Sequence, residues 1–198
     1  TLYNQYLPLR MLLCLCNTQQ GDDVTATIID GAAIALEVRN EVAQQVLELQ
    51  QRHNATPGLA VVLVGDNPAS ASYVRGKERA CQEVGMYTET LYLPEDATQS
   101  QVMELVERLN VEERFHGILT QLPFPPQVDE SAVIRSLNPE KDVDGLHPYS
   151  AGLLAVGEPR FIPATPYGVQ QMLVRSGNDP EGKHVVVCGR SNLVGRPL

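Results

Sequence analysis

Apolar positions along the chain alternate between helical and extended spacing. From about residue 32 to 52 they recur every three or four positions, which predicts an amphipathic helix. Residues 59–64 form a continuous apolar run of strand length, as is typical of a strand buried on both faces. A helix is predicted over about 70–84 and another strand over 87–93. Helix and strand therefore alternate from the start of this pattern.

The alternation continues in the second half of the chain. Thr98 and Gln101 have capping-box spacing and predict a helix that runs to about Asn110. Residues 117–122 predict a third buried strand, and a short helix is expected over 130–136. A long loop rich in proline, glycine and charged residues follows. Strands separated by helices favour a parallel sheet covered on both faces, which is an α/β fold.

The ends of the chain are predicted from fewer signals. Thr165 is expected to cap a helix that has Pro166 at its first position and ends at Gly177. The apolar run at 184–188 predicts a last strand. Residues 1–27 are interpreted as an extension outside the fold.

Composition excludes several classes of protein. Of the 198 residues, 43% are hydrophobic and 20% charged, as in ordinary globular proteins. A formal net charge of −9 without runs of Lys or Arg argues against a nucleic-acid partner. The four cysteines and four histidines lack paired ligand spacing, so neither structural zinc nor a disulfide framework is expected. The apolar run at 9–16 is far shorter than the roughly 20 residues that span a bilayer, so no membrane partner is expected.

Three polar, proline-bearing loops follow predicted strands. They cover residues 66–70, 121–126 and 138–150. Ligands of open parallel sheets bind at the carboxyl ends of the strands. The loops therefore predict a cleft at this edge.

The helix after the first of these loops carries candidate proton-transfer groups. Ser70, Tyr73 and Lys77 are spaced to lie on one helical face. A partly buried lysine near a phenol has a lowered pKa, which suits a general base or proton shuttle. The spacing also fits a solvated helix whose lysine covers apolar surface with its stem. Short-chain dehydrogenases share the Tyr–Lys spacing, but their glycine-rich loop precedes it, whereas the turn at 189–197 comes more than a hundred residues later.

Two further loops carry candidate polar contacts. Gln121 ends a predicted strand and can donate and accept hydrogen bonds, although it also fits a simple strand stop. Asp142 and Asp144 precede Gly145, but the further acidic positions of a calcium loop are missing, so no metal site is predicted. A single carboxylate in a cleft would suit a heterocycle with adjacent N–H donors.

Four motifs together resemble the bifunctional methylenetetrahydrofolate dehydrogenase/methenyltetrahydrofolate cyclohydrolase family. They are SASYVRGK at 70–77, QLPFPP at 121–126, PEKDVDGLHP at 139–148 and GRSNLVGRP at 189–197. The likeness begins at Ile28 and runs to Leu198, and the motifs agree with the family in order and spacing.

The resemblance implies a fold, an activity and a domain organisation. We expect a three-layer α-β-α folate-binding catalytic domain over 28–163, then an incomplete Rossmann-type NAD(P)-binding domain over 164–198. The family oxidises 5,10-methylenetetrahydrofolate with NADP, or NAD in some members, and hydrolyses the methenyl product to 10-formyltetrahydrofolate. It also implies a homodimer for full-length members of the family, and a role in one-carbon and purine supply. Cytoplasmic localisation is expected, with an organelle as the alternative if residues 1–27 are a targeting segment.

The resemblance also assigns roles to residues of the folate half. Lys77 corresponds to the catalytic lysine, and Gln121 to the glutamine that partners it. Tyr73 corresponds to the tyrosine that stacks on folate and assists the lysine. Ser70 corresponds to the substrate-binding serine one turn earlier, and Asp144 to the carboxylate that holds the pterin ring.

For the cofactor half, the resemblance points to the turn after residue 188. Gly189 permits close approach of the backbone, and Arg190 and Ser191 are expected to hold the phosphate that distinguishes NADP from NAD. Only ten residues follow Cys188, too few for a crossover helix and partner strand. We therefore expect a chain truncated at its carboxyl end. A catalytically silent folate-binding or partner-binding form is the alternative to an active enzyme.

Overall fold

A three-stranded parallel sheet is the centre of the fold. The computed structural model describes residues 11–12 and 26–198. The strands are β3 (Gly58–Val64), β4 (Tyr87–Leu93) and β5 (Gly117–Thr120), in the order β4-β3-β5. Helix α2 (Pro68–Glu83) connects β3 to β4, and α3 (Gln99–Val111) connects β4 to β5.

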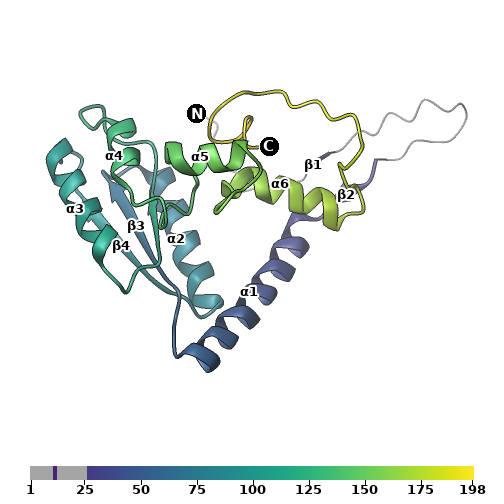
Figure 1. Ribbon diagram of the computed structural model, residues 1–198, viewed down its shortest axis with the longest axis horizontal. Coiled ribbons are helices and arrows are strands. Elements are labelled where there is room, and N and C mark those ends of the chain that lie inside the picture. Colours follow the sequence, from purple (N-terminus) through teal and green to yellow (C-terminus); the bar gives the residue numbers. More distant parts are fainter. Residues whose placement is uncertain (1–10, 13–25) are drawn as a thin grey trace, which may run out of the picture.

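Alternate residues of the central strand pack on opposite faces of the sheet. Ala60, Val62 and Val64 belong to the larger core cluster, with side chains from α3 and from α4 (Glu130–Ser136). Val61 and Leu63 belong to a second cluster that includes Val74 of α2. The two covered faces explain why β3 is a continuous apolar run. Figure 1 shows the resulting three layers, with α3 and α4 on one side of the sheet and α2 on the other.

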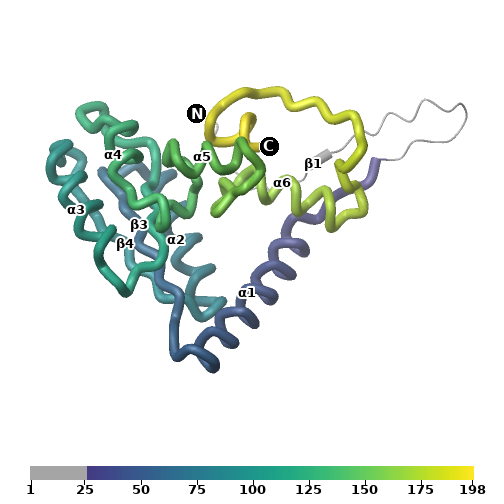
Figure 2. The backbone as a smooth tube through the Cα atoms, in the orientation of Figure 1, coloured from purple at the N-terminus to yellow at the C-terminus, as the bar shows by residue number. Residues whose placement is uncertain are grey.

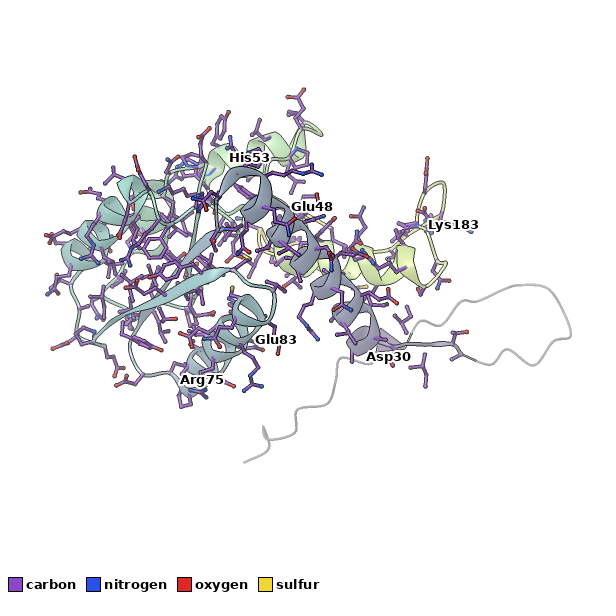
Figure 3. The ribbon with its side chains drawn as sticks, turned by 90° about the horizontal axis from the view of Figure 1, so that it is seen from below. Asp30, Glu48, His53, Arg75, Glu83 and Lys183 are labelled. Atoms are coloured by element: carbon purple, nitrogen blue, oxygen red, sulfur yellow. The ribbon has the colours of Figure 1, made fainter. Side chains whose placement is uncertain are left out.

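Helix α1 (Gly31–His53) runs away from the sheet, as Figure 1 shows. Asp30 caps it by accepting hydrogen bonds from two backbone N–H groups of the first turn, at 3.0 and 3.1 Å. In Figure 3, Asp30 and His53 mark its two ends. An ion pair of 3.3 Å joins Arg39 of α1 to Glu83 at the end of α2.

Two further helices follow the sheet along the chain. They are α5 (Pro148–Ala155) and α6 (Ala164–Arg175). Arg175 of α6 donates two hydrogen bonds of 2.7 Å to the carboxylate of Glu41 in α1, which connects the two helices. Figure 2 shows that the chain after α6 forms a long arc and returns towards α5 and α6.

Most predicted elements are confirmed. The helices predicted over 32–52, 70–84, 98–110 and 130–136 and the strands predicted over 59–64 and 87–93 form within one or two residues of these limits. The capping box of Thr98 and Gln101 is present. The third strand ends at Thr120, two residues earlier than predicted.

Three predictions for the later part of the chain are wrong. A long loop is predicted after the helix at 130–136, but residues 148–155 form α5. Thr165 is not an N-cap, because α6 begins at Ala164 after Pro163 and has no side-chain cap. Residues 184–188 form no strand, since no described strand pairs with them, and Val186 is 72% exposed. The end of α6 near Gly177, whose φ is +79°, is confirmed.

Little of residues 1–27 is described. The two residues of β1 (Met11–Leu12) pair antiparallel with β2 (Ile28–Ile29). The prediction that this segment is an extension otherwise lies outside the described residues. Within residues 26–198, no helix has the length and apolarity that crossing a membrane requires.

Candidate functional site

Helix α2 places three of the predicted residues at the carboxyl edge of the sheet. It starts because Asn67 accepts hydrogen bonds from the backbone N–H groups of Ala69 and Ser70, at 2.9 and 3.3 Å. Ser70 is buried, with 4% exposure, whereas Tyr73 one turn later is 68% exposed. Lys77 follows one further turn along the helix.

Gln121 reaches the same place from the end of β5. Its backbone N–H donates to the carbonyl oxygen of Val62 at 2.9 Å, which continues the pairing with β3. Its side-chain Nε2 donates to the carbonyl oxygen of Leu122 at 2.9 Å. This bond leaves Oε1 to accept a hydrogen bond of 3.0 Å from Lys77 Nζ. The amide is therefore oriented on both sides.

A cavity of about 400 Å³ contains this pair. Tyr73 and Asp144 also line it, so the structure brings four of the predicted residues together. Ser70 and the preceding loop do not line it. The remaining walls come from the end of β5, the following loops, the start of α6 and the turn near the carboxyl end: Leu119, Thr120, Leu122, Leu146, Pro163, Ala164, Thr165 and Leu193.

Burial shifts the pKa values of Lys77 and Asp144 in the cavity, and the attraction between their charges only partly opposes these shifts. Burial lowers the pKa of Lys77, and the negative charge of Asp144 opposes that shift. Burial raises the pKa of Asp144, with a smaller contribution in the same direction from Asp142, while the positive charge of Lys77 lowers it. Both shifts favour the neutral forms. A lysine and a carboxyl group whose pKa values are shifted in these directions within one cavity are candidates for proton transfer and for ligand binding.

The loop that carries Asp144 depends on a second carboxylate that the sequence did not single out for this role. Asp142 is 1% exposed, and its two oxygens accept hydrogen bonds from the backbone N–H groups of Leu146 and His147, at 3.2 and 2.8 Å. Gly145 lies within this turn with a φ of +63°. A Cβ atom at Gly145 would also lie 3.2 Å from the backbone carbonyl oxygen of Phe161 and 3.2 Å from the ring Cδ atom of Pro163. The short D-V-D-G spacing was the only signal for this turn.

Among the described residues, no group of three His, Cys, Asp or Glu side chains could hold a metal ion. The two oxygens of Asp142 instead accept backbone N–H groups.

The three residues predicted for the cofactor lie elsewhere. Gly189 and Ser191 line a second cavity of about 620 Å³ beside α5 and α6, and Arg190 lines neither cavity. All three are exposed. Ser191 Oγ accepts hydrogen bonds from the N–H groups of Val194 and Gly195, at 3.1 and 3.3 Å, which closes the turn on itself.

Comparison with known proteins identifies the family of this chain. The catalytic domain of the tetrahydrofolate dehydrogenase/cyclohydrolase family matches residues 29–144, more than half of the chain. The NAD(P)-binding domain of the same family matches residues 163–198. The chain belongs to this family. The catalytic-domain match contains all four predicted cavity residues, and the NAD(P)-binding match contains the turn at 189–197.

Relatives of the family agree in sequence and in fold. The bifunctional protein FolD of Dehalococcoides mccartyi is 50% identical over 175 residues, which are 88% of this chain and 59% of that protein. The crystal structure of the bifunctional FolD of Campylobacter jejuni has a TM-score of 0.82 and 40% identity, covering 85% of this chain and 60% of that chain. FolD of Trypanosoma brucei, solved in complex with NADP cofactor and inhibitor, has a TM-score of 0.82 and 37% identity over 86% of this chain and 59% of that chain. The chain therefore spans about three fifths of the length of these relatives.

In this chain, the turn at 189–197 carries two side chains that can bind a phosphate group. The Arg190 guanidinium is exposed and has no hydrogen-bond or ion-pair partner among the described residues. Ser191 Oγ accepts two backbone N–H groups and keeps its own O–H as a donor. A guanidinium and a hydroxyl donor on neighbouring residues are groups that can bind a phosphate monoester.

Proposed function

We propose that this chain carries the folate site and the start of the cofactor site of a bifunctional folate enzyme. The enzyme oxidises 5,10-methylenetetrahydrofolate to 5,10-methenyltetrahydrofolate and hydrolyses that product to 10-formyltetrahydrofolate. The observation that carries the proposal is the hydrogen bond between Lys77 and Gln121 inside a cavity that Tyr73 and Asp144 also line.

Lys77 accepts the proton that the attacking water loses during the hydrolysis. Water adds to the positively charged methenyl carbon and loses a proton as its oxygen bonds to that carbon. A neutral amine accepts this proton, and burial supports that role because it lowers the pKa of Lys77. The bond from the methenyl carbon to N5 then breaks, N5 takes up the remaining hydroxyl proton, and the carbon is left on N10 as the formyl group. Gln121 holds the amine with its Oε1 atom without adding a negative charge, so it does not restore the ordinary pKa.

Asp144 and Tyr73 hold the substrate. The carboxylate of Asp144 accepts N–H groups of the pterin ring and thereby places the reacting carbon beside Lys77, which is an orientation effect. The exposed ring of Tyr73 offers a face on which the folate stacks, and its hydroxyl assists Lys77. Ser70 contributes to the substrate site from the turn of α2 before Tyr73.

Gly189, Arg190 and Ser191 bind the cofactor. NADP, when bound, supplies the oxidation by accepting hydride from the bridging carbon of the folate. Arg190 and Ser191 hold its additional phosphate, and NAD is the alternative cofactor. The Rossmann-type domain to which this turn belongs begins near residue 164, and the folate-binding domain covers 28–163.

The enzyme forms a homodimer in the cytoplasm and serves one-carbon metabolism. Homodimer formation, cytoplasmic localisation and a role in one-carbon supply for purine synthesis follow from the family resemblance. Sedimentation of the purified chain tests the first of these, with a mass of about twice 21.7 kDa as the expected result.

The decisive assay combines binding and turnover. The purified chain is mixed with 5,10-methylenetetrahydrofolate and NADP, and the absorbance of the reduced cofactor is followed. A rise that requires both compounds supports the enzyme. Binding of the folate without any rise supports the silent folate-binding form instead, and absence of folate binding contradicts both.

A further inference from the structure

The turn at 142–147 is built around a buried charge. Asp142 is 1% exposed, and a carboxylate in such a place is costly unless its oxygens are hydrogen-bonded. Each oxygen accepts one backbone N–H group, Oδ1 from Leu146 and Oδ2 from His147. Within the described part of the chain, the carboxylate accepts its hydrogen bonds from the backbone of the turn that follows it.

The same residue also joins the turn to the sheet. Asp142 forms a parallel bridge with Ile118 of β5, and the N–H group of Ile118 donates to the carbonyl oxygen of Lys141 at 2.7 Å. The carbonyl oxygen of Asp142 accepts the N–H group of Gly145 at 3.1 Å. Asp144 lies between these bonds, so its backbone is held on both sides.

We propose that Asp142 is a positioning residue for Asp144: its carboxylate closes the turn that presents Asp144 to the cavity opposite Lys77. This inference rests on the proposed function, in which Asp144 binds the pterin ring. Asp142 does not line the cavity and so does not touch the substrate. Its negative charge also acts on Asp144 and contributes to the raised pKa of that group.

The test compares two carboxylates that bind backbone N–H groups. Asp142→Asn keeps the shape but replaces one accepting oxygen with an NH₂ group, which cannot accept a hydrogen bond. The matched control is Asp129→Asn. Asp129 caps α4 by accepting the N–H groups of Ser131 and Ala132, and it does not line the cavity.

Hydrogen exchange and NMR titration of the whole chain read out the positioning without any ligand. In Asp142→Asn, the amide of Leu146 or His147 is expected to exchange at least about tenfold faster, because one of them loses its acceptor. The pKa of Asp144 is expected to fall, because a negative neighbour has been removed. Asp129→Asn should leave both signals unchanged. Unchanged amides and an unchanged Asp144 titration in Asp142→Asn would overturn the inference.

Binding of tetrahydrofolate to the same proteins separates this inference from the proposed function. We expect Asp142→Asn to raise the Kd by about tenfold and Asp129→Asn to leave it unchanged. If the unsubstituted chain binds no tetrahydrofolate, the proposed function fails, and the NMR result alone decides whether Asp142 positions Asp144. If the chain binds but Asp142→Asn binds equally well, the positioning role is refuted while the folate site stands.

Discussion

Lys77 on α2 donates a hydrogen bond of 3.0 Å to the side-chain oxygen of Gln121, which lies 44 residues later in the chain at the end of β5. The acceptor is an amide and carries no charge. Among the described residues, Asp144 alone opposes the effect of burial on the lysine, and the pKa of Lys77 stays below its ordinary value. The fold thus holds the amine in place and lowers its pKa, and both effects suit a lysine that accepts a proton.

The identity of residue 121 should set the pH dependence of hydrolysis. In Gln121→Glu a carboxylate faces the ammonium, which favours the charged form and raises the pKa of Lys77. Because the neutral amine then exists only at higher pH, the rising limb of the pH–rate profile should move to higher pH. Gln121→Ala should lower the rate without that displacement to higher pH, since it adds no charge. A rising limb in Gln121→Glu at the same pH as in the unsubstituted chain would contradict the pairing as a catalytic device.

Loss of the Asp144 carboxylate should weaken folate binding. Asp144→Ala removes a charged acceptor for pterin N–H groups, and hydrogen bonds to charged groups are worth about 1.5–3 kcal/mol, so the Kd should rise about 10- to 100-fold. Isothermal titration calorimetry with tetrahydrofolate measures the change. Glu140→Ala is the matched control, because Glu140 lies in the same loop but pairs with Arg160 outside the cavity. Equal affinities of Asp144→Ala and the unsubstituted chain would refute the role.

Folate affinity should also fall in acid at a higher pH than an ordinary aspartate would cause. Asp144 binds the pterin in its charged form, and its pKa is raised from the ordinary 3.8. As the pH falls, the carboxylate takes up a proton at that raised pKa, and binding is lost from there downwards. Titrations at a series of pH values should show this loss in the unsubstituted chain and not in Asp144→Asn. The same acid dependence in both proteins would assign it to another group.

Arg190 should distinguish the two nicotinamide cofactors. Arg190→Ala removes the guanidinium proposed to hold the additional phosphate, so affinity for NADP should fall about 10- to 100-fold while affinity for NAD stays constant. Arg196→Ala is a suitable control, because it removes an exposed positive charge from the same turn. Parallel losses for NADP and NAD, or equal effects of the two substitutions, would argue against a phosphate contact at Arg190.

The capping box at the start of α3 should be measurable in the free energy of unfolding. Thr98→Ala removes the side-chain oxygen that accepts the N–H group of Gln101 and should cost about 1 kcal/mol. Urea denaturation measures the loss. Ser100→Ala, in the exposed first turn of the same helix, should change the stability by less than about 0.5 kcal/mol. A cost at Ser100 equal to that at Thr98 would show that the cap is not the source.

The sheet could be predicted from the sequence because its strands are buried on both faces. The apolar run at 59–64 can be satisfied only by two covered faces, and the helices that cover them have clear periodicity and caps. The sequence does not reveal α5, because Pro148 fits the proline-rich loop as well as the first turn of a helix, where it stands after the cap of His147. The apolar run at 184–188 can form a strand only if another strand pairs with it, and the local sequence does not show whether such a partner is present.

The candidate site was less predictable than the fold. Tyr73 and Lys77 share a helix face, which spacing predicts, but the contact between Lys77 and Gln121 joins two elements that only the packing of α2 against the sheet brings together. The sequence does not reveal the structural role of Asp142, because its partners are backbone N–H groups four and five residues later. Such bonds depend on the path of the turn and leave only the D-V-D-G motif in the sequence.

The hydrolysis of 5,10-methenyltetrahydrofolate by Lys77→Met tests the central claim most directly. The loss of substrate absorbance is followed with the chain, with Lys77→Met and with Lys183→Met, and the spontaneous rate is subtracted. Lys183, labelled in Figure 3, is an exposed lysine on the segment after α6 and serves as the matched control. Far-ultraviolet circular dichroism verifies that all three proteins are folded. We predict that Lys77→Met loses at least about a hundredfold in rate while Lys183→Met retains the full rate. A near-normal rate in folded Lys77→Met would contradict the account.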